Sequence, residues 1–536
     1  MDRLEIEIVS VGSSAEGVGI LPSGKKIFVD SPVIPGEVCL VGITEDKKRF
    51  ARGRCERLLK TSPDRVIPFG SEVPGADLAH ISYEKQLEIK RDRVRDCLIR
   101  LGGFSQEYVD GILADIVPSD KTEHYRNHMQ YSIKNGRFCL KSRGTNEDVP
   151  VDGSPLEYEV FGRVREVITK AFEDYPTNLF DGMVLRGSER TGEVLMEFVS
   201  YSGNPSEITI RDAGDFLTAT EIIRKMNGIN IAGIMLRISN TATQKRTRGG
   251  KRVCLYGRDH YMERLCGRIY KVKSGAFFQV NVPQAEKLYG LAAPSDYKGS
   301  LWDLYCGTGT VGLSLARDGH KLIGVDLSPE AISSAKTNAS SFGIDAEFIC
   351  RPASRITDLL SSLSGDDAVV VDPPRAGLEY SLISSLLDRK PAQISYISCD
   401  PATLARDLKL LTSDGTYEIK SITPVDMFPG TAAVETVVLL SKLSSAPKLE
   451  VRLKMSDLDL TEAEAKATYD EIQEYVKKQT GLHVSHLNIA QIKRKHGIIE
   501  RANYNLPKSE NSRQPNCPPE KEKAIVAALK HFKMID

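Results

Sequence analysis

The sequence lacks several features that mark special classes of protein. Its ten cysteines are scattered and none form a C-x-x-C pair, which argues against a zinc ribbon and a disulfide framework. No uninterrupted apolar run reaches the roughly 18 residues that a membrane span needs. Residues 1–8 alternate like a strand and carry no apolar core of a secretion signal. We therefore expect a cytoplasmic protein that binds no membrane.

The chain also lacks an excess of charge of either sign. Lys plus Arg and Asp plus Glu number 72 each, so net charge does not indicate a nucleic-acid partner, and such binding must come from local patches. Basic side chains gather in two segments, 47–57 and 244–252. Either segment could contact a phosphate backbone, although a solvated strand face is the more common role of a pattern like the first.

With 536 residues, the chain is too long for one hydrophobic core. Residues 1–58 alternate apolar and polar side chains around Gly-containing turns, which predicts a small β-barrel. Residues 59–262 read as a mixed α+β domain, whose helix at 83–101 could pack on the domain that follows. Residues 263–443 alternate apolar runs with amphipathic helices, which is typical of a doubly wound α/β sheet. Residues 450–536 form a helical C-terminal extension with one helix at 462–478, one at 489–495 and a last one from about 520.

Three segments of the α/β region carry chemistry. The strand that begins at 301 runs into the Gly-rich turn Asp303–Thr310, where a nucleotide-like ligand would fit, and Asp326 ends the next strand, where it could bind ribose hydroxyls. Asp372 opens an Asp-Pro-Pro-Arg turn after another strand. Cys399 lies between a strand and a helix and could be a nucleophile, although a cysteine at a strand end is usually a core thiol. Cys306, inside the Gly-rich turn, is expected only to pack.

Together with Phe277–Asn281 and the segment Asp426–Glu435, these motifs resemble in order and spacing the RNA uracil-5-methyltransferase family. The resemblance covers residues 1 to about 443. It implies a class I (Rossmann-like) methyltransferase fold and S-adenosylmethionine as the cofactor. The matching positions are Gln279, Tyr305, Asp326 and Asp372 for contacts with S-adenosylmethionine, Cys399 for the nucleophile and Glu435 for the base.

The resemblance extends to RNA-binding parts of the chain. Residues 1–58, with Glu16–Gly19 and Pro35–Val38, resemble the TRAM domain, an OB-like RNA-binding barrel, and Tyr125–Asn127 resembles a central-domain motif in which Arg126 is a candidate RNA contact. The barrel favours 23S ribosomal RNA as the substrate. The implied reaction is methylation of carbon 5 of a uridine by a monomeric enzyme, which gives 5-methyluridine.

Uracil chemistry explains why a thiol and a base would be paired. Carbon 5 of uracil is too weak a nucleophile to take a methyl group unaided. Addition of Cys399 to carbon 6 would create an enolate whose carbon 5 can attack, and Glu435 would then remove the carbon-5 proton so that Cys399 is eliminated. The expected mechanism therefore passes through a covalent cysteine–uracil intermediate, for which the base must leave its stack.

The sequence departs from the family at two places. Many relatives hold an iron–sulfur cluster through three cysteines after the barrel and a fourth further on, but residues 56–96 contain no cysteine, and Ser154 stands where the fourth is expected. Because a cluster needs its thiolates, we expect no iron–sulfur cluster and no other metal. Ala433 stands where relatives often have histidine.

Three alternatives stay open at this level. The substrate could be the thymine loop of transfer RNA, or the fold could serve a noncatalytic RNA-binding protein. In the C-terminal extension, two helices around a turn at Gly481 could contact RNA as a helix-turn-helix, or they could pack on the methyltransferase.

Overall fold

The structure is a computed structural model with two compact units, Met1–Leu449 and Glu450–Asp536. Of the basic segment 244–252, residues 244–248 lie outside the described residues, as do residues 462–468 of the expected helix 462–478. The described residues are 3–30, 32–69, 73, 75–142, 147–201, 207–239, 249–351, 359–443, 469–495 and 518–532.

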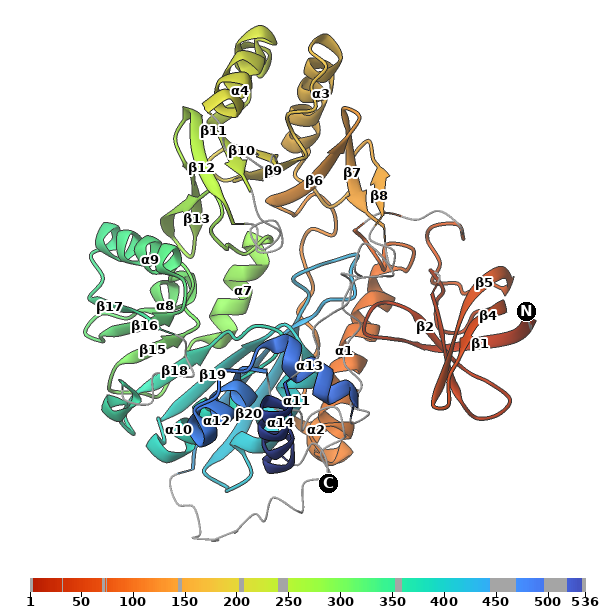
Figure 1. Ribbon diagram of the computed structural model, residues 1–536, viewed down its shortest axis with the longest axis vertical. Coiled ribbons are helices and arrows are strands. Elements are labelled where there is room, and N and C mark those ends of the chain that lie inside the picture. The colour runs from red at the N-terminus through yellow and green to blue at the C-terminus, as the bar shows by residue number, and fades with distance from the viewer. Residues whose placement is uncertain are drawn as a thin grey trace. The chain divides into compact units, whose positions relative to one another are not determined.

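The N-terminal strands form a closed barrel in the order β1-β2-β3-β5-β4, as the alternating pattern predicts (Figure 1). Every second side chain along the strands points into the barrel, and Ile6, Ile8 and Ile27 are among those that fill it. At Gly19 a Cβ would lie 2.3 Å from a methyl group of Ile6, so only glycine permits this close approach of β1 and β2. The strands are β1 (Arg3–Val11), β2 (Gly17–Ile20), β3 (Lys26–Val29), β4 (Val38–Asp46) and β5 (Phe50–Lys60).

A second sheet of seven strands follows, in the order β12-β11-β10-β9-β6-β7-β8. Only the pair β10–β11 is parallel. Helices α3 and α4 bury aromatic side chains such as Phe161, Phe172 and Phe216 against one of its faces, and α5 adds Ile222. The elements are β6 (His128–Lys134), β7 (Arg137–Lys141), β8 (Asp148–Pro150), α3 (Glu159–Asp174), β9 (Gly182–Gly187), β10 (Glu193–Ser200), α4 (Glu207–Ala219), α5 (Ile222–Lys225), β11 (Asn230–Ile238) and β12 (Lys251–Gly257).

The third sheet has the order β17-β16-β15-β18-β19-β21-β20, in which only β21 runs antiparallel to its neighbours. This is the doubly wound α/β arrangement that the sequence predicts. A separate hairpin, β13 (His260–Leu265) with β14 (Arg268–Lys273), precedes it. The elements of the sheet region are α7 (Val282–Ala292), β15 (Leu301–Leu304), α8 (Thr310–Leu315), β16 (Leu322–Asp326), α9 (Pro329–Phe342), β17 (Ala346–Cys350), η2 (Leu359–Ser362), β18 (Ala368–Val371), α10 (Tyr380–Arg389), β19 (Gln393–Ser398), α11 (Pro401–Leu411), β20 (Tyr417–Val425) and β21 (Glu435–Lys442).

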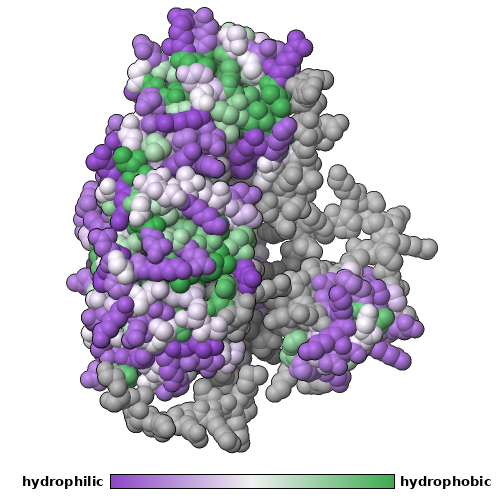
Figure 2. Space-filling view, turned by 90° about the vertical axis from the view of Figure 1, so that its left-hand side faces the viewer, coloured by the Kyte–Doolittle hydropathy of each residue, from purple (hydrophilic) through white to green (hydrophobic). Residues whose placement is uncertain are grey.

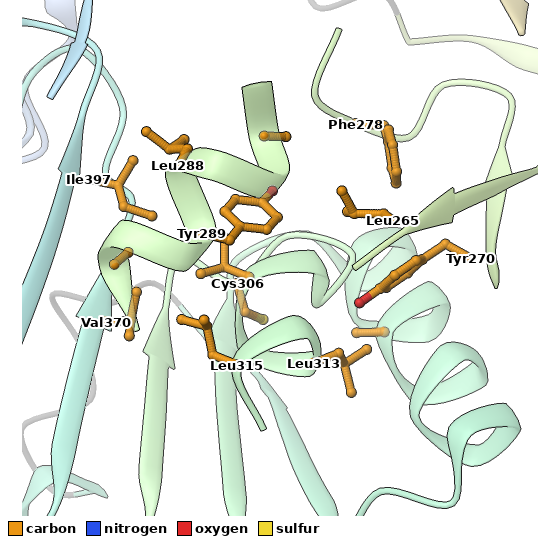
Figure 3. Packing of buried hydrophobic residues seen from close by; sticks show 14 of the residues in the cluster. Leu265, Tyr270, Phe278, Leu288, Tyr289, Cys306, Leu313, Leu315, Val370 and Ile397 are labelled. Carbon is orange, nitrogen blue, oxygen red and sulfur yellow. The ribbon is translucent and has the colours of Figure 1, made fainter. Parts of the chain in front are cut away.

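Helices cover both faces of this sheet, because alternate residues of each buried strand point to opposite sides. On β18, Val369 and Val371 face a cluster that contains α1 (Tyr83–Arg100), α2 (Gln106–Ile112), α10 and α11. Val370 faces the other cluster, with α7, α8 and α9. In Figure 3, Leu288 and Tyr289 of α7 lie over the strands that carry Val370 and Ile397. Helix α1 thus packs on this sheet through Val94 and Leu98.

Two strands of this sheet, β17 and β20, were not anticipated from the sequence. The first is only five residues long. The second, Tyr417–Val425, mixes polar residues with a proline and is the last strand of the sheet, where residues 113–117 make only isolated bridges to Ile422 and Val425.

In the C-terminal unit, three helices share one hydrophobic core. They are α12 (Tyr469–Thr480), α13 (His486–Lys495) and α14 (Pro519–His531), and Ile472, Ile489 and Ile525 lie at its centre. Gly481, with φ of +71°, turns the chain between α12 and α13, as expected. The role of the unit, in RNA contact or in packing, stays a prediction.

Among the coloured residues of Figure 2, hydrophilic ones cover much of the surface, with apolar residues in groups between them. Within the described ranges, no helix combines the length and the apolar character that a membrane crossing would need.

Candidate active site

The carboxyl ends of the parallel strands mark the candidate site. The chain leaves β15 for β16 and β17 on one side and reaches β18 and β19 on the other, so the order of the sheet reverses between β15 and β18. Ligands of open α/β sheets bind at such a reversal. The motifs that follow these strands, namely the Gly-rich turn, Asp326, Asp372 and Cys399, therefore meet at one edge.

The Gly-rich turn has a backbone that few other sequences could adopt. Gly307 and Gly309 have φ of +55° and +80°, and Tyr305 has φ of +70°, a conformation that is uncommon for a residue with a side chain. At Gly312 a Cβ would lie 2.7 Å from a carboxylate oxygen of Asp303, the same oxygen that accepts the Gly312 N–H. The turn thus brings α8 close to β15, while a Cβ at Gly307 would meet no atom within 4 Å.

The predicted cofactor residues surround this turn. Asp326, at the end of β16, accepts the N–H of Gly307 at 3.0 Å through one oxygen and the N–H of Ser328 at 2.8 Å through the other. Gln279 lies before α7, and the side-chain amide of Asn127 donates to the backbone carbonyl of Gln279 at 2.8 Å. Asp372 follows β18 directly.

Local hydrogen bonds fix the backbone on both sides of Cys399. We call residues 398–403 the Cys399 turn. Asp400 caps α11, because its side chain accepts the N–H groups of Ala402 at 2.9 Å and Thr403 at 3.2 Å. Its own N–H donates to the hydroxyl of Ser398 at 3.2 Å. The thiol therefore lies between a strand end and a capped helix, as the sequence predicts.

Glu435 is the first residue of β21 and is only 6% exposed. It pairs with Val425, the last residue of β20, so residues 426–434 form the loop of a β-hairpin. We call this segment the Glu435 loop. The hairpin places the carboxylate beside the strand that delivers Cys399, because β21 is the neighbour of β19.

All of the predicted site residues line one cavity of about 1040 Å³. Its wall also includes Arg126, the predicted RNA contact, whose Nε has no hydrogen-bond partner among the described residues. Ala433 and Cys306 lie in the wall as well, and in Figure 3 Tyr289 of α7 lies near Cys306. The predicted site residues in the wall are Gln279, Tyr305, Asp326, Asp372, Cys399 and Glu435.

Carboxyl groups dominate the electrostatics of this cavity. Burial raises the pKa of Glu435 to about 8, and the charge of Asp372 adds to the shift while Arg375 opposes it. Burial also raises the pKa of Asp372 to about 7. The pKa of the Cys399 thiol rises to about 11, first because it is partly buried and then because Glu435 and Asp372 are negative neighbours. A cation bound among these groups would lower all three pKa values.

Comparisons with known proteins show what this chain is similar to. A model of the tRNA (uracil-5-)-methyltransferase family matches residues 246–443. An uncharacterized RNA methyltransferase of Clostridium acetobutylicum is 31% identical over 460 residues, which cover 82% of this chain and 97% of the relative. One of Porphyromonas gingivalis is 33% identical over 469 residues, 80% of this chain and 98% of the relative.

The chain belongs to the RNA uracil-5-methyltransferase family. It is therefore an enzyme that uses S-adenosylmethionine. A solved structure of the same kind, the tRNA (uracil-54, C5)-methyltransferase of Pyrococcus abyssi in complex with S-adenosyl-L-homocysteine, is 28% identical with a TM-score of 0.64. It covers 82% of this chain, and this chain covers 100% of it.

Sequence reasoning missed several residues of the RNA uracil-5-methyltransferase site. Ser13 of the barrel and Arg93 of α1 line the cavity, although both lie far from the catalytic motifs in sequence. Lys90 of α1 lies behind the Glu435 loop and forms an ion pair with Asp426. The available signal was that Gln86 and Lys90 continue the i, i+4 row of the apolar Val94 and Leu98.

Proposed function

We propose that this enzyme methylates carbon 5 of a uridine through a covalent intermediate, with Cys399 as the nucleophile and Glu435 as the base. The observation that carries the proposal is the common cavity, to which a strand-end thiol and a buried carboxylate from the neighbouring strand both contribute. Two separate segments thus supply the two groups that the reaction requires.

The cavity suits S-adenosylmethionine in shape and charge. Tyr305 and Gln279 would contact the cofactor, and Asp326 would accept hydrogen bonds from its ribose. The open space beside Gly307 permits close approach to the backbone. The raised pKa values of Asp372 and Glu435 indicate carboxyl groups without a sufficient counter-charge, which a sulfonium or ammonium group would provide. When bound, the cofactor supplies the methyl group on a positive sulfonium.

The steps at the protein follow from these roles. The Cys399 thiol loses its proton to water, and the thiolate forms a bond with carbon 6 of uracil, which moves the ring's electron pair into an enolate. Carbon 5 then uses this pair to take the methyl group. Glu435 accepts the proton of carbon 5, and the released pair restores the double bond and expels the Cys399 thiolate. The products are 5-methyluridine and S-adenosylhomocysteine, and the enzyme is regenerated when Glu435 returns its proton to solvent.

For the RNA, our first candidate is a uridine of 23S ribosomal RNA, held partly by the N-terminal barrel. The barrel carries exposed arginines, Arg54 and Arg57, on β5, whereas Arg52 is bound to Asp30 at 3.1 Å. Ser13 and Ser14 of the barrel reach the cavity, which would let the barrel hold the strand that carries the target base. We propose that the enzyme works in the cytoplasm as a monomer.

Transfer RNA is the second candidate, since the similar Pyrococcus abyssi structure is a tRNA (uracil-54, C5)-methyltransferase. To decide between them, the enzyme would be incubated with radiolabelled methyl donor and with unmodified 23S ribosomal RNA or unmodified transfer RNA in parallel. We expect label in 5-methyluridine of the ribosomal RNA. Label only in transfer RNA would overturn the first candidate and leave the chemistry intact.

A further inference from the structure

The Glu435 loop is held by side chains that come from outside the catalytic sheet. The backbone carbonyl of Pro429 accepts the Tyr125 hydroxyl at 2.9 Å, and the carbonyl of Asp426 accepts the amide of Gln284 at 3.0 Å. The loop makes few ladder bonds of its own, because it is a hairpin connection. Its conformation therefore depends on these distant partners.

Lys90 of α1 makes the most heavily buried of these contacts. Its ammonium lies 2.5 Å from a carboxylate oxygen of Asp426, and the two side chains are 1% and 0% exposed. The same ammonium donates to the carbonyl of Phe428 at 3.0 Å. A buried lysine needs a paired charge and further acceptors, so α1 and the loop can dock only where Asp426 and Phe428 provide them.

Two neighbours on α1 extend this contact along the loop. Gln86 accepts the N–H of Gly430 at 2.8 Å, and Arg93 donates to the carbonyl of Ala432 at 3.0 Å. Positions 86, 90 and 93 lie on one face of the helix because they are four and three residues apart. The face thus holds the loop at successive points up to three residues before Glu435.

We propose that Lys90 and Gln86 are positioning residues for Glu435. The assignment rests on the proposed mechanism, in which Glu435 removes the carbon-5 proton after the methyl group has been transferred. Neither side chain is among those that line the cavity, so each acts through the loop. Displacement of the loop would slow proton removal, whereas addition of Cys399 to uracil depends on the separate Cys399 turn.

The test compares two RNA substrates, one with uridine and one with 5-fluorouridine at the target position. Fluorine at carbon 5 prevents the last proton removal, so formation of the trapped adduct reports the steps before Glu435 acts. With Lys90→Met we expect near wild-type trapping on fluorinated RNA, but about a hundredfold slower turnover on uridine RNA. The covalent adduct with uridine RNA should then accumulate in denaturing gels.

Matched variants make the result specific. Lys85→Met changes a lysine on the same helix whose partner is the exposed Glu88, and we expect it to leave both rates unchanged. If Lys90→Met does not fold, Lys90→Met with Asp426→Leu removes the buried charge pair as a whole. Gln86→Met leaves that pair in place and removes the acceptor for Gly430 together with a donor to the carbonyl of Ile81. Each should show the same selective loss of turnover.

Parallel loss of trapping and turnover, or no loss of either, would overturn the assignment and leave the proposed function intact. Failure of the wild-type enzyme to form a methylated adduct with the fluorinated RNA would overturn the covalent mechanism, and the assignment with it.

Discussion

Cys399 and Glu435 face one cavity, but the backbone around each is held in a different way. In the Cys399 turn, Ser398 and Asp400 bond to groups at most three residues away. The Glu435 loop, in contrast, is bonded to Lys90 and Gln86 of α1, which are 336 and 344 residues away from their partners in the loop. The Cys399 turn is therefore held mainly by nearby groups, with one more remote bond from the Thr403 hydroxyl to the carbonyl of Arg375 at 3.2 Å, whereas the loop before Glu435 depends on the docking of α1.

This difference suits the proposed order of the reaction. A nucleophile at a capped helix start is presented by local geometry, which a strand, a turn and an Asp cap can supply. In the proposed order the base acts later, and a loop fixed by remote contacts would hold its carboxylate in place for removal of the proton. The comparison predicts that changes at the two regions separate addition from elimination.

The largest expected effect comes from removal of the base itself. Glu435→Gln keeps the size of the side chain but cannot accept the carbon-5 proton, so we expect product formation to fall about 10²–10⁴-fold. Addition of Cys399 should persist. Denaturing gels with ordinary uridine RNA should show a long-lived adduct, and normal release of 5-methyluridine would contradict the role of Glu435.

The next effect concerns stability and sharpens the contrast between remote and local contacts. Lys90→Met leaves the buried Asp426 carboxylate without its counter-charge, so the free energy of unfolding should fall by about 3–5 kcal/mol. Urea unfolding of the full chain can follow the fluorescence of Trp302, its one tryptophan, which is buried in β15. Lys85→Met should change stability by less than about 0.5 kcal/mol. Equal losses in the two variants would contradict the importance of the buried pair.

The pH dependence tests the electrostatics of the thiol. Because the pKa of Cys399 is raised to about 11, the thiolate fraction at neutral pH is small and grows with pH. Below that pKa, alkylation of Cys399 in the free protein should accelerate about tenfold per pH unit between about pH 7 and pH 9. Peptide mass spectrometry after iodoacetamide treatment measures the alkylation rate of Cys399. A rate that does not change between about pH 7 and pH 9 would indicate a thiol with a low pKa.

The smallest effect is expected at the local cap. Asp400→Ala removes the acceptor for the first turn of α11 and should cost about 1 kcal/mol of stability. Ser105→Ala removes a similar cap from α2, where the Ser105 hydroxyl accepts the N–H of Tyr108 at 3.2 Å. The two should cost similar stability, but only Asp400→Ala should slow trapping on fluorinated RNA. Equal trapping in both variants would show that the Cys399 turn does not need its cap.

The same contrast explains which features the sequence could reveal. The barrel, the doubly wound sheet and the Cys399 turn follow from short-range patterns, namely strand alternation, apolar runs between amphipathic helices, and a cysteine followed by an Asp cap and Pro401. Glu435 was found only because its loop resembles a family motif. Its place in the cavity depends on pairing between β21 and β19.

The contacts of α1 lay beyond such reasoning. Nothing local relates Lys90 to Asp426, because their pairing arises only when the helix docks on the hairpin loop. Strand β20 was missed for a related reason, since an edge strand needs fewer apolar residues than a buried one. The position of the cavity could thus be predicted from the strand ends, but the contacts between α1 and the Glu435 loop could not.

The most direct test of the central claim is covalent trapping on 5-fluorouridine-substituted 23S ribosomal RNA with S-adenosylmethionine. Mass spectrometry would compare the wild-type enzyme with Cys399→Ala and with Cys254→Ala, a control at an exposed cysteine of β12. We predict a methylated RNA–protein adduct for the wild type and Cys254→Ala, and none for Cys399→Ala. An adduct that survives Cys399→Ala would contradict the assignment of the nucleophile.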